Sequence, residues 1–160
     1  MKIFYAVSLI ALSAGLTACN RAEAPAPVAA TTAQASAQTV TTVVNGKRFI
    51  LSTTPTATLQ AGVARQYGIT QSDDTILVLV SVTDTAGNPV SPGLAQVTVY
   101  AGIAPDAPTE IAMKPVQVEG FSNLVGQLTV KPPAKLTLRM EVNEGGSHTS
   151  QSFTRDVLPR

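Results

Sequence analysis

The feature that most restricts the fold of this chain is a series of short runs in which apolar and polar side chains alternate. The clearest run covers residues 135–142, where Leu136, Leu138, Met140 and Val142 alternate with charged or hydroxyl side chains. Successive side chains of a strand point to opposite faces of its sheet. This run therefore predicts a half-buried antiparallel strand with four apolar side chains on its inner face.

A second run, residues 76–82 (ILVLVSV), is the most apolar stretch of the predicted domain. It is short, rich in branched side chains and bounded by aspartates, which favours a strand over a helix. Its even-numbered residues are expected to face the core. Leu77 and Leu79 on the other face then need a second cover, and we expect residues 59–67 to supply it.

Turn residues divide the rest of the chain into similar pieces. Asn45-Gly46 is the strongest short hairpin signal, and it separates two β-rich segments. A short helix is predicted next, with Thr58 as its cap, Leu59, Val63 and Tyr67 on one face, and Gly68 as its end. Further strands are expected at residues 41–44, 47–51, 94–101, 109–114 with a continuation through 116–118, 124–130, and 148–155 at an edge.

Seven or eight short strands and at most one short helix predict an all-β protein, namely an immunoglobulin-like antiparallel β-sandwich. A small β-barrel is the alternative. Frequent valine and threonine, with 11 glycines and 11 prolines, agree with a sheet protein rich in turns.

The N-terminus has the layout of a bacterial export signal. Lys2 supplies a positive charge, residues 3–12 are almost wholly apolar, and small residues follow. The run is shorter than the 20 or so apolar residues that a spanning helix needs. Leu16-Thr17-Ala18-Cys19 resembles the lipobox of a bacterial lipoprotein, in which Cys19 is acylated and becomes the first residue after cleavage.

This resemblance divides the chain into three parts. Residues 1–18 are the expected signal peptide, residues 19–39 a lipidated cysteine with a flexible tether rich in alanine, proline and threonine, and residues 40–160 the β-sandwich domain. Two or three acyl chains hold a protein stably on a membrane. Asn20 is not the aspartate that favours inner-membrane retention in sorted lipoproteins. The resemblance therefore favours the outer membrane, with the domain facing the periplasm.

Charge and cysteine content narrow the possible partners and cofactors. Without Lys2, the mature chain has ten basic and ten acidic side chains, so it has no electrostatic footprint for nucleic acid. Cys19 is the only cysteine, so the domain is expected to fold without a disulfide.

One further resemblance concerns a family. The segment Val63-Ala64-Arg65-Gln66-Tyr67-Gly68-Ile69, followed by a polar turn and ILVLVSV, is similar to a small exported Gram-negative family known only as domain of unknown function number 4426. The late strand pair at 124–130 and 135–142 fits the same family. The similarity covers about residues 43–155. It implies a β-sandwich and no known activity, so no functional residue is transferred.

Candidates for chemistry are few. His148, the only histidine, follows Gly145-Gly146-Ser147, and an exposed turn histidine is the favoured interpretation because a catalytic histidine needs an oriented partner on each side. No G-x-S-x-G nucleophile elbow is present. Met113 and Met140 have soft-metal chemistry, but both fall on predicted inward faces, where methionine fills gaps.

Two charged pairs have simple structural interpretations as well. Asp73-Asp74 are adjacent, so they point to opposite faces of a strand and do not converge on one ligand. Lys47-Arg48 could touch lipid headgroups or an acidic partner, but a charged strand start is favoured. We expect a non-enzymatic, lipid-anchored interaction or accessory module of the cell envelope, with an envelope protein as a possible partner and no cofactor. A carrier of a small apolar ligand or a metal ion is the alternative.

Overall fold

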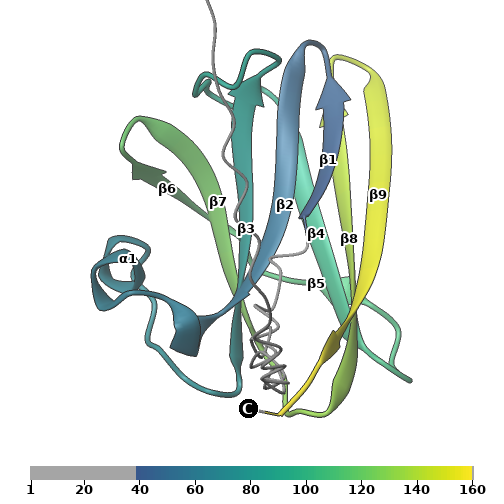
Figure 1. The fold of residues 1–160 in the computed structure, drawn as a ribbon. Helices are drawn as coiled ribbons and strands as arrows, with labels where there is room; N and C mark the ends of the chain where they lie inside the picture. Colours follow the sequence, from purple (N-terminus) through teal and green to yellow (C-terminus); the bar gives the residue numbers. More distant parts are fainter. Residues whose placement is uncertain (1–38, 160) are drawn as a thin grey trace, which may run out of the picture. The chain divides into compact units, whose positions relative to one another are not determined.

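In a computed structural model of this chain, residues 39–159 can be described, and they form two antiparallel β-sheets packed face to face (Figure 1). The strands are β1 (Thr39–Val44), β2 (Lys47–Pro55), β3 (Thr75–Asp84), β4 (Gln96–Ile103), β5 (Thr109–Glu110), β6 (Lys114–Val118), β7 (Phe121–Thr129), β8 (Ala134–Glu144) and β9 (Ser147–Val157). One sheet has the order β1-β2-β3-β7-β6 and the other the order β5-β4-β8-β9.

This architecture confirms the predicted all-β sandwich. Within the described part of the chain the two sheets stay separate, so the barrel alternative is wrong. The strand number differs slightly from the seven or eight expected, because two short strands replace one predicted strand at residues 109–118. The start of β4 also differs: the strand begins at Gln96, and Leu94, predicted as part of it, is 92% exposed in the preceding loop.

The segment 109–118 changes sheets, which the alternation pattern did not predict. β5 pairs with β4, whereas β6 pairs with β7 in the opposite sheet. Between them the chain crosses the side of the sandwich, and Ile111 and Met113 both pack against the main core. Because β6 pairs with β7 and not with β4, Val116 and Val118 do not continue the earlier strand.

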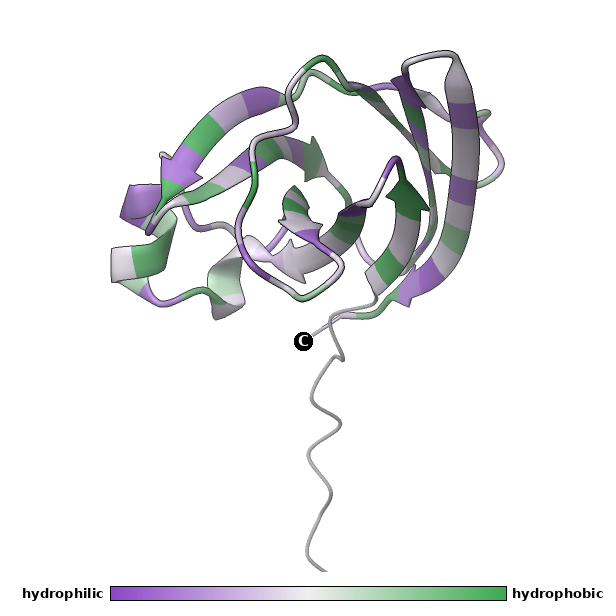
Figure 2. Cartoon of the chain, turned by 90° about the horizontal axis from the view of Figure 1, so that it is seen from above, coloured by the Kyte–Doolittle hydropathy of each residue, from purple (hydrophilic) through white to green (hydrophobic). Residues whose placement is uncertain are grey.

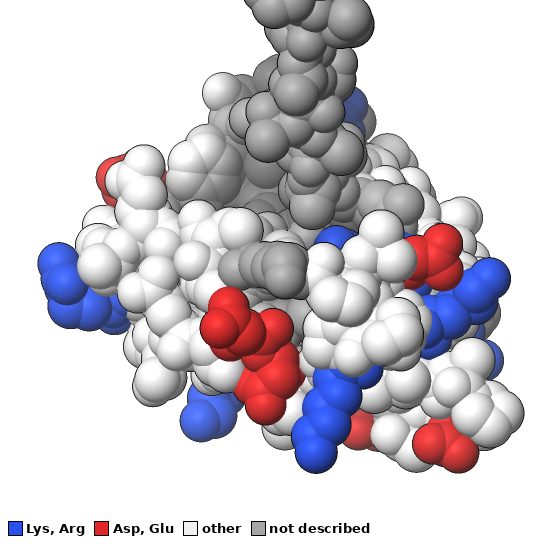
Figure 3. All heavy atoms as spheres, turned by 60° about the horizontal axis from the view of Figure 1, so that its bottom comes forward, with Lys and Arg blue, Asp and Glu red and all other residues white. Residues whose placement is uncertain are grey.

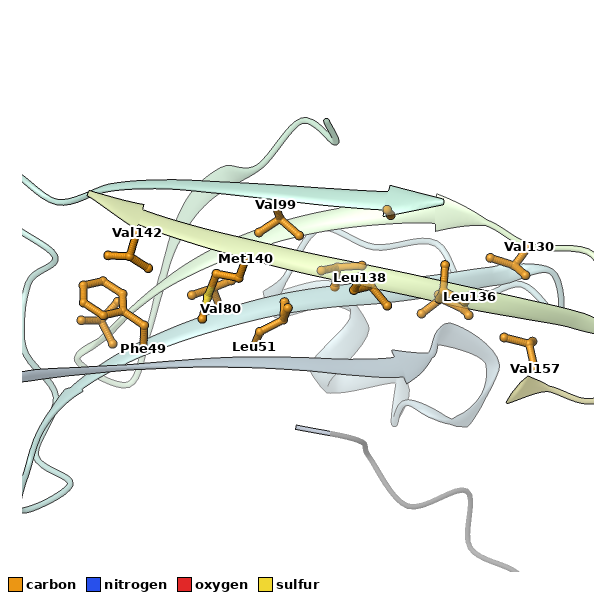
Figure 4. Packing of buried hydrophobic residues seen from close by; sticks show 14 of the residues in the cluster. Phe49, Leu51, Val80, Val99, Val130, Leu136, Leu138, Met140, Val142 and Val157 are labelled. Atoms are coloured by element: carbon orange, nitrogen blue, oxygen red, sulfur yellow. The ribbon is translucent and has the colours of Figure 1, made fainter. Parts of the chain in front are cut away.

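The main core lies between the sheets and is built from the alternating runs. Phe49, Leu51 and Val80 meet the inner face of β4 and β8, as Figure 4 shows. The four predicted inward residues of β8 are all fully buried: Leu136, Leu138, Met140 and Val142. The same alternation is visible as green and purple bands along the strands in Figure 2. The core prediction is therefore confirmed for the two most strongly patterned strands.

The outer face of β3 has the second cover that its sequence requires. Leu77 is buried in a small cluster with Ile69 and Val125, against which Leu59 and Tyr67 pack. The prediction that residues 59–67 cover Leu77 and Leu79 is thus confirmed. These covering residues lie in and around the 3₁₀ turn η1 (Thr56–Thr58) and the helix α1 (Ala61–Gln66), as seen at the lower left of Figure 1.

The start of the helix was predicted wrongly. Thr58 belongs to the 3₁₀ turn, where its hydroxyl donates to the Pro55 carbonyl at 2.7 Å, and Gln60 is the residue before α1. The extended backbone at Leu59 and Gln60 divides the region into two short pieces. The end was predicted correctly: Gly68 has φ +65°, and the Ile69 amide donates to the Ala64 carbonyl at 2.8 Å, as in a Schellman motif.

Candidate functional site

A cleft of about 340 Å³ opens at the end of the sandwich where β2 and β9 finish and β3 begins. Its lining comes from four segments that are far apart in the sequence. Apolar side chains predominate: Pro55, Ile76, Val130, Pro132, Val157, Leu158 and Pro159, with Asp73, Asp74 and Thr75 at the start of β3. A volume of this size is at the lower end of the range of small-molecule sites. The cleft is therefore the candidate functional site of the domain.

The acidic wall of the cleft is an organised turn. The Asp74 carboxylate accepts hydrogen bonds from the Ser72 hydroxyl and, at 3.3 Å, from the Thr75 hydroxyl. The Asp74 carbonyl accepts from the Val130 amide at 2.6 Å, which ties the end of the β7 segment to the start of β3. These contacts hold the wall in place without any ligand.

The electrostatics at this wall favour an ionised carboxylate. The hydrogen bond from Ser72, supported by Thr75 and by the positive charge of Lys131, lowers the pKa of Asp74 below its ordinary value of 3.8. Asp74 is thus negative at any physiological pH. The end of the molecule at which the C-terminus lies, seen in Figure 3, carries acidic and basic side chains dispersed among uncharged ones.

Next to the cleft, Arg155 joins the two sheets. Its side chain is only 7% exposed, and its Nη1 donates to the Thr53 hydroxyl at 2.8 Å and to the Thr53 carbonyl at 3.3 Å. Burial lowers the pKa of Arg155, although a guanidinium keeps its charge at neutral pH. Sequence reasoning missed this residue. Its position between Phe153 and Val157 on the inward face of a strand was the signal that could have revealed it.

His148 lies far along β9 from the cleft. The histidine is near the start of the strand and Val157, which lines the cleft, is at its end. His148 is exposed, and its Nδ1 is 2.7 Å from the Asn143 side-chain oxygen on β8. The structure therefore does not bring His148 together with Asp73 and Asp74.

Neither methionine is placed for metal binding. Met140 is fully buried in the main core and Met113 packs against it. Across residues 39–159 there is no group of three or more histidine, cysteine or acidic side chains that could hold a metal ion.

Lys47 and Arg48 both make contacts within the domain. The Lys47 ammonium pairs with the Glu144 carboxylate and donates to the Pro92 carbonyl at 3.0 Å. Arg48 donates to the Thr85 carbonyl at 3.0 Å. Together with Asn45, which donates to the Glu144 carbonyl at 3.1 Å, these contacts fasten the turns at the end of the sandwich opposite the cleft.

The predicted signal peptide, lipobox cysteine Cys19 and most of the tether lie outside the described residues. In the part of the chain that the structure does describe, no helix has the length and apolar character needed to cross a membrane.

Comparison with known proteins identifies a family and several solved structures. The family model described as "Domain of unknown function (DUF4426)" matches residues 41–159. The crystal structure of a DUF4426 family protein from Pseudomonas aeruginosa PAO1 matches with a TM-score of 0.60 and 20% identity, over 76% of this chain and 96% of that chain. At this identity the likeness concerns the fold alone. The GAE domain of GGA2p from Saccharomyces cerevisiae has a TM-score of only 0.29 and 6% identity, over 75% of this chain and 96% of that one. No curated protein sequence matches the chain.

Proposed function

We propose that this chain, which belongs to the DUF4426 family of domains of unknown function, acts as a lipid-anchored, non-enzymatic accessory module on the periplasmic side of the cell envelope. The observation that carries the proposal is the order of charged, apolar and small residues ending in Leu16-Thr17-Ala18-Cys19. The outer membrane is the favoured location, because Asn20 is not a retention signal of the aspartate type.

The arrangement of the domain supports a binding role over catalysis. Its charged and polar side chains are used for structure: Lys47 pairs with Glu144, Asp74 organises a turn, and His148 contacts Asn143. Catalysis by a histidine requires a nucleophile and an orienting group around one ring. His148 is exposed, and its Nδ1 lies 2.7 Å from the side-chain oxygen of Asn143 on β8.

Lipidation is tested first. The full chain is produced in a Gram-negative host in the presence of an alkyne-labelled fatty acid, next to a Cys19→Ser variant. We expect the label and membrane attachment in the wild-type chain and the loss of both in the variant. An unlabelled wild-type chain together with a Cys19→Ser variant that stays on the membrane would contradict the anchor.

The accessory role is tested by cross-linking with the tether intact. A photo-reactive amino acid is placed at Val43 or at Leu94, two exposed apolar positions at 52% and 92% exposure. The same variants kept in the dark provide the control. Capture of one defined envelope protein from the exposed positions supports the role. Equal capture without irradiation, or no capture from either position, contradicts it.

A second candidate function is a carrier of a small apolar ligand, which the cleft of about 340 Å³ favours. Its test is native mass spectrometry of the protein isolated from cells. Leu158 lines the cleft and is 70% exposed, so Leu158→Asp should remove a bound mass without unfolding the domain. Leu94→Asp, at an exposed site outside the cleft, should keep it. A wild-type protein without any bound mass rules out the carrier role.

A further inference from the structure

Among the described strands, β9 is the longest that has a hydrogen-bonded neighbour on one side only. Its eleven residues pair with β8 on one side, and β9 is the last strand of its sheet. The two-residue turn Gly145-Gly146 has φ +57° and +83°, as in a type I′ hairpin. Such a turn makes Glu144 and Ser147 a hydrogen-bonded pair, so hydrogen bonding to β8 alternates from there along the strand.

This alternation decides which backbone groups face outward. Odd-numbered residues of β9 exchange hydrogen bonds with β8, whereas even-numbered residues direct their amide and carbonyl groups to the open edge. The even-numbered residues also have exposed side chains: His148, Ser150, Ser152, Thr154 and Asp156. The edge thus presents five residues with backbone groups ready for a further strand.

The other edges of the sandwich are shorter than β9 or carry residue types that hinder strand addition. β5 has only two residues, and β6 carries Lys114 and Pro115, two residue types that block strand addition. β1 has six residues and packs beside the first half of β9, where the Thr42 hydroxyl shares a hydrogen bond with the Thr149 hydroxyl at 3.3 Å. On β9, the one inward charge, Arg155, is held by Thr53 of the same molecule.

We propose that β9 pairs with β9 of a second copy of this chain, antiparallel and about a two-fold axis at Ser152. This register aligns all eleven residues of Ser147–Val157 with their counterparts and leaves no overhang. Each outward-facing backbone group then meets an outward-facing group of the partner strand. The result is a continuous eight-stranded sheet with an isologous interface.

The side chains are complementary in the same register. Ser152 lies opposite its own copy, Ser150 opposite Thr154, and His148 opposite Asp156, which are favourable hydroxyl and acid–base pairs across strands. On the inner face, Arg155 lies opposite Thr149 and Phe153 opposite Gln151. No like charges face each other across the two β9 strands, and like charges directly opposite would destabilise such a pair.

The opposite sheet contacts β9 at two separate places. Within one molecule, Thr42 of β1 contacts the first half of β9, whereas Thr53 of β2 contacts its second half through Arg155. Antiparallel pairing sets the first half of one β9 against the second half of the other. The two β1 strands therefore lie at opposite ends of the shared edge.

Engineered cysteines test the register in the full chain produced in a Gram-negative host. Directly opposed residues of an antiparallel pair have Cα atoms about 5.5 Å apart, within the span of a disulfide. Ser152→Cys should therefore give a disulfide-linked band at twice the monomer mass after mild oxidation. Ser150→Cys, on the same exposed face, would be roughly 14 Å from its own copy along the strands and should stay monomeric.

A double variant checks the pairing independently. Adding Thr154→Cys to Ser150→Cys should restore the cross-linked dimer. The wild-type chain and a Cys19→Ser background show the contribution of the native cysteine, so this test does not depend on lipidation. The proposal is overturned if Ser152→Cys cross-links no more than Ser150→Cys, or if its adduct contains a different protein.

A proline variant tests the interface without disturbing the fold. The Ser152 amide faces the open edge, so Ser152→Pro removes no hydrogen bond to β8 and proline is tolerated at such edge positions. We expect unchanged thermal unfolding of the monomer but loss of the dimer in cross-linking and ultracentrifugation. Equal dimer content in Ser152→Pro and the wild-type chain would refute the pairing.

Discussion

The Arg155 guanidinium of β9 donates to the Thr53 hydroxyl of β2 at 2.8 Å, and this contact joins the two sheets beside the cleft. The pair is 102 residues apart in the sequence. A buried guanidinium must be hydrogen-bonded to offset its lost hydration. The contact therefore gives the outer strand β9 a fixed attachment to the opposite sheet.

The first prediction concerns this pair. Thr53→Val keeps the shape of the side chain but removes the hydroxyl acceptor, and should destabilise the domain by about 1–3 kcal/mol because the buried guanidinium loses its shorter hydrogen bond and keeps only the 3.3 Å contact to the Thr53 carbonyl. Chemical unfolding measures the change. Thr137→Val removes an exposed hydroxyl contact to Thr154 and is the matched control, with an expected change below about 0.5 kcal/mol. Equal losses of stability in the two variants would show that the Arg155–Thr53 hydrogen bond does not stabilise the domain more than an exposed one.

A second prediction tests the central strand of the smaller sheet. Leu138 is fully buried between the sheets, so Leu138→Ala leaves a cavity and should cost about 2–5 kcal/mol. Leu94→Ala makes the same chemical change at a position that is 92% exposed, and should have little effect. Urea unfolding of both variants gives the comparison. A Leu138→Ala loss no larger than that of Leu94→Ala would show that the core is elsewhere.

The third prediction uses two glycines in different surroundings. A Cβ added at Gly102 would lie 2.7 Å from the Pro108 backbone, so Gly102→Ala should force the loop before β5 to move and destabilise the domain by about 1–3 kcal/mol. Gly62 in α1 has no atom within 4 Å of its added Cβ. Gly62→Ala should instead stabilise by about 0.5–1 kcal/mol, since alanine favours helix. Thermal unfolding should thus shift in opposite directions, and a shift in the same direction would contradict the geometry.

The fourth prediction is a loss of stability in acid that involves Asp84. The side-chain nitrogen and the backbone amide of Asn88 each donate to the Asp84 carboxylate at 2.8 Å. These hydrogen bonds lower the pKa of Asp84 below its ordinary value of 3.8. A carboxyl group with a lower pKa in the folded state stabilises the fold above its unfolded pKa. This contribution disappears as the pH falls through the folded pKa.

Unfolding measured at neutral pH and near pH 3 checks this fourth prediction. The wild-type domain should lose more stability between these conditions than Asn88→Ala, in which the donor side chain is missing. An equal loss in both proteins would show that the turn does not perturb Asp84.

The strand faces and turns of this protein could be read from local pattern. The two-residue period of a strand identifies the inward residues of β3 and β8. The residue types that accept a positive φ mark the Asn45-Gly46 hairpin and the helix end at Gly68. Even the cover over Leu77 was foreseeable, because a strand apolar on both faces needs packing on both.

The candidate site was not foreseeable in the same way. Pro55, Asp74, Val130 and Leu158 lie in four separate segments, and no local pattern indicates that they meet at one cleft. The wrong helix start at Thr58 has a related cause, since the hydroxyl bonded back to Pro55 rather than forward to the helix.

The sequence by itself determined where most strands lie and which side of each is apolar, and Leu16–Cys19 is the basis of the proposed lipid anchor. Only the tertiary structure decided that the chain crosses between sheets at Ile111 and Met113, that Arg155 faces inward onto Thr53, and that β9 is a long open edge. The physical reason is that alternation is a property of neighbouring residues. Which sheet a segment joins, which strand it pairs with and which residue its buried side chains bond to depend on the packing of residues far apart along the chain.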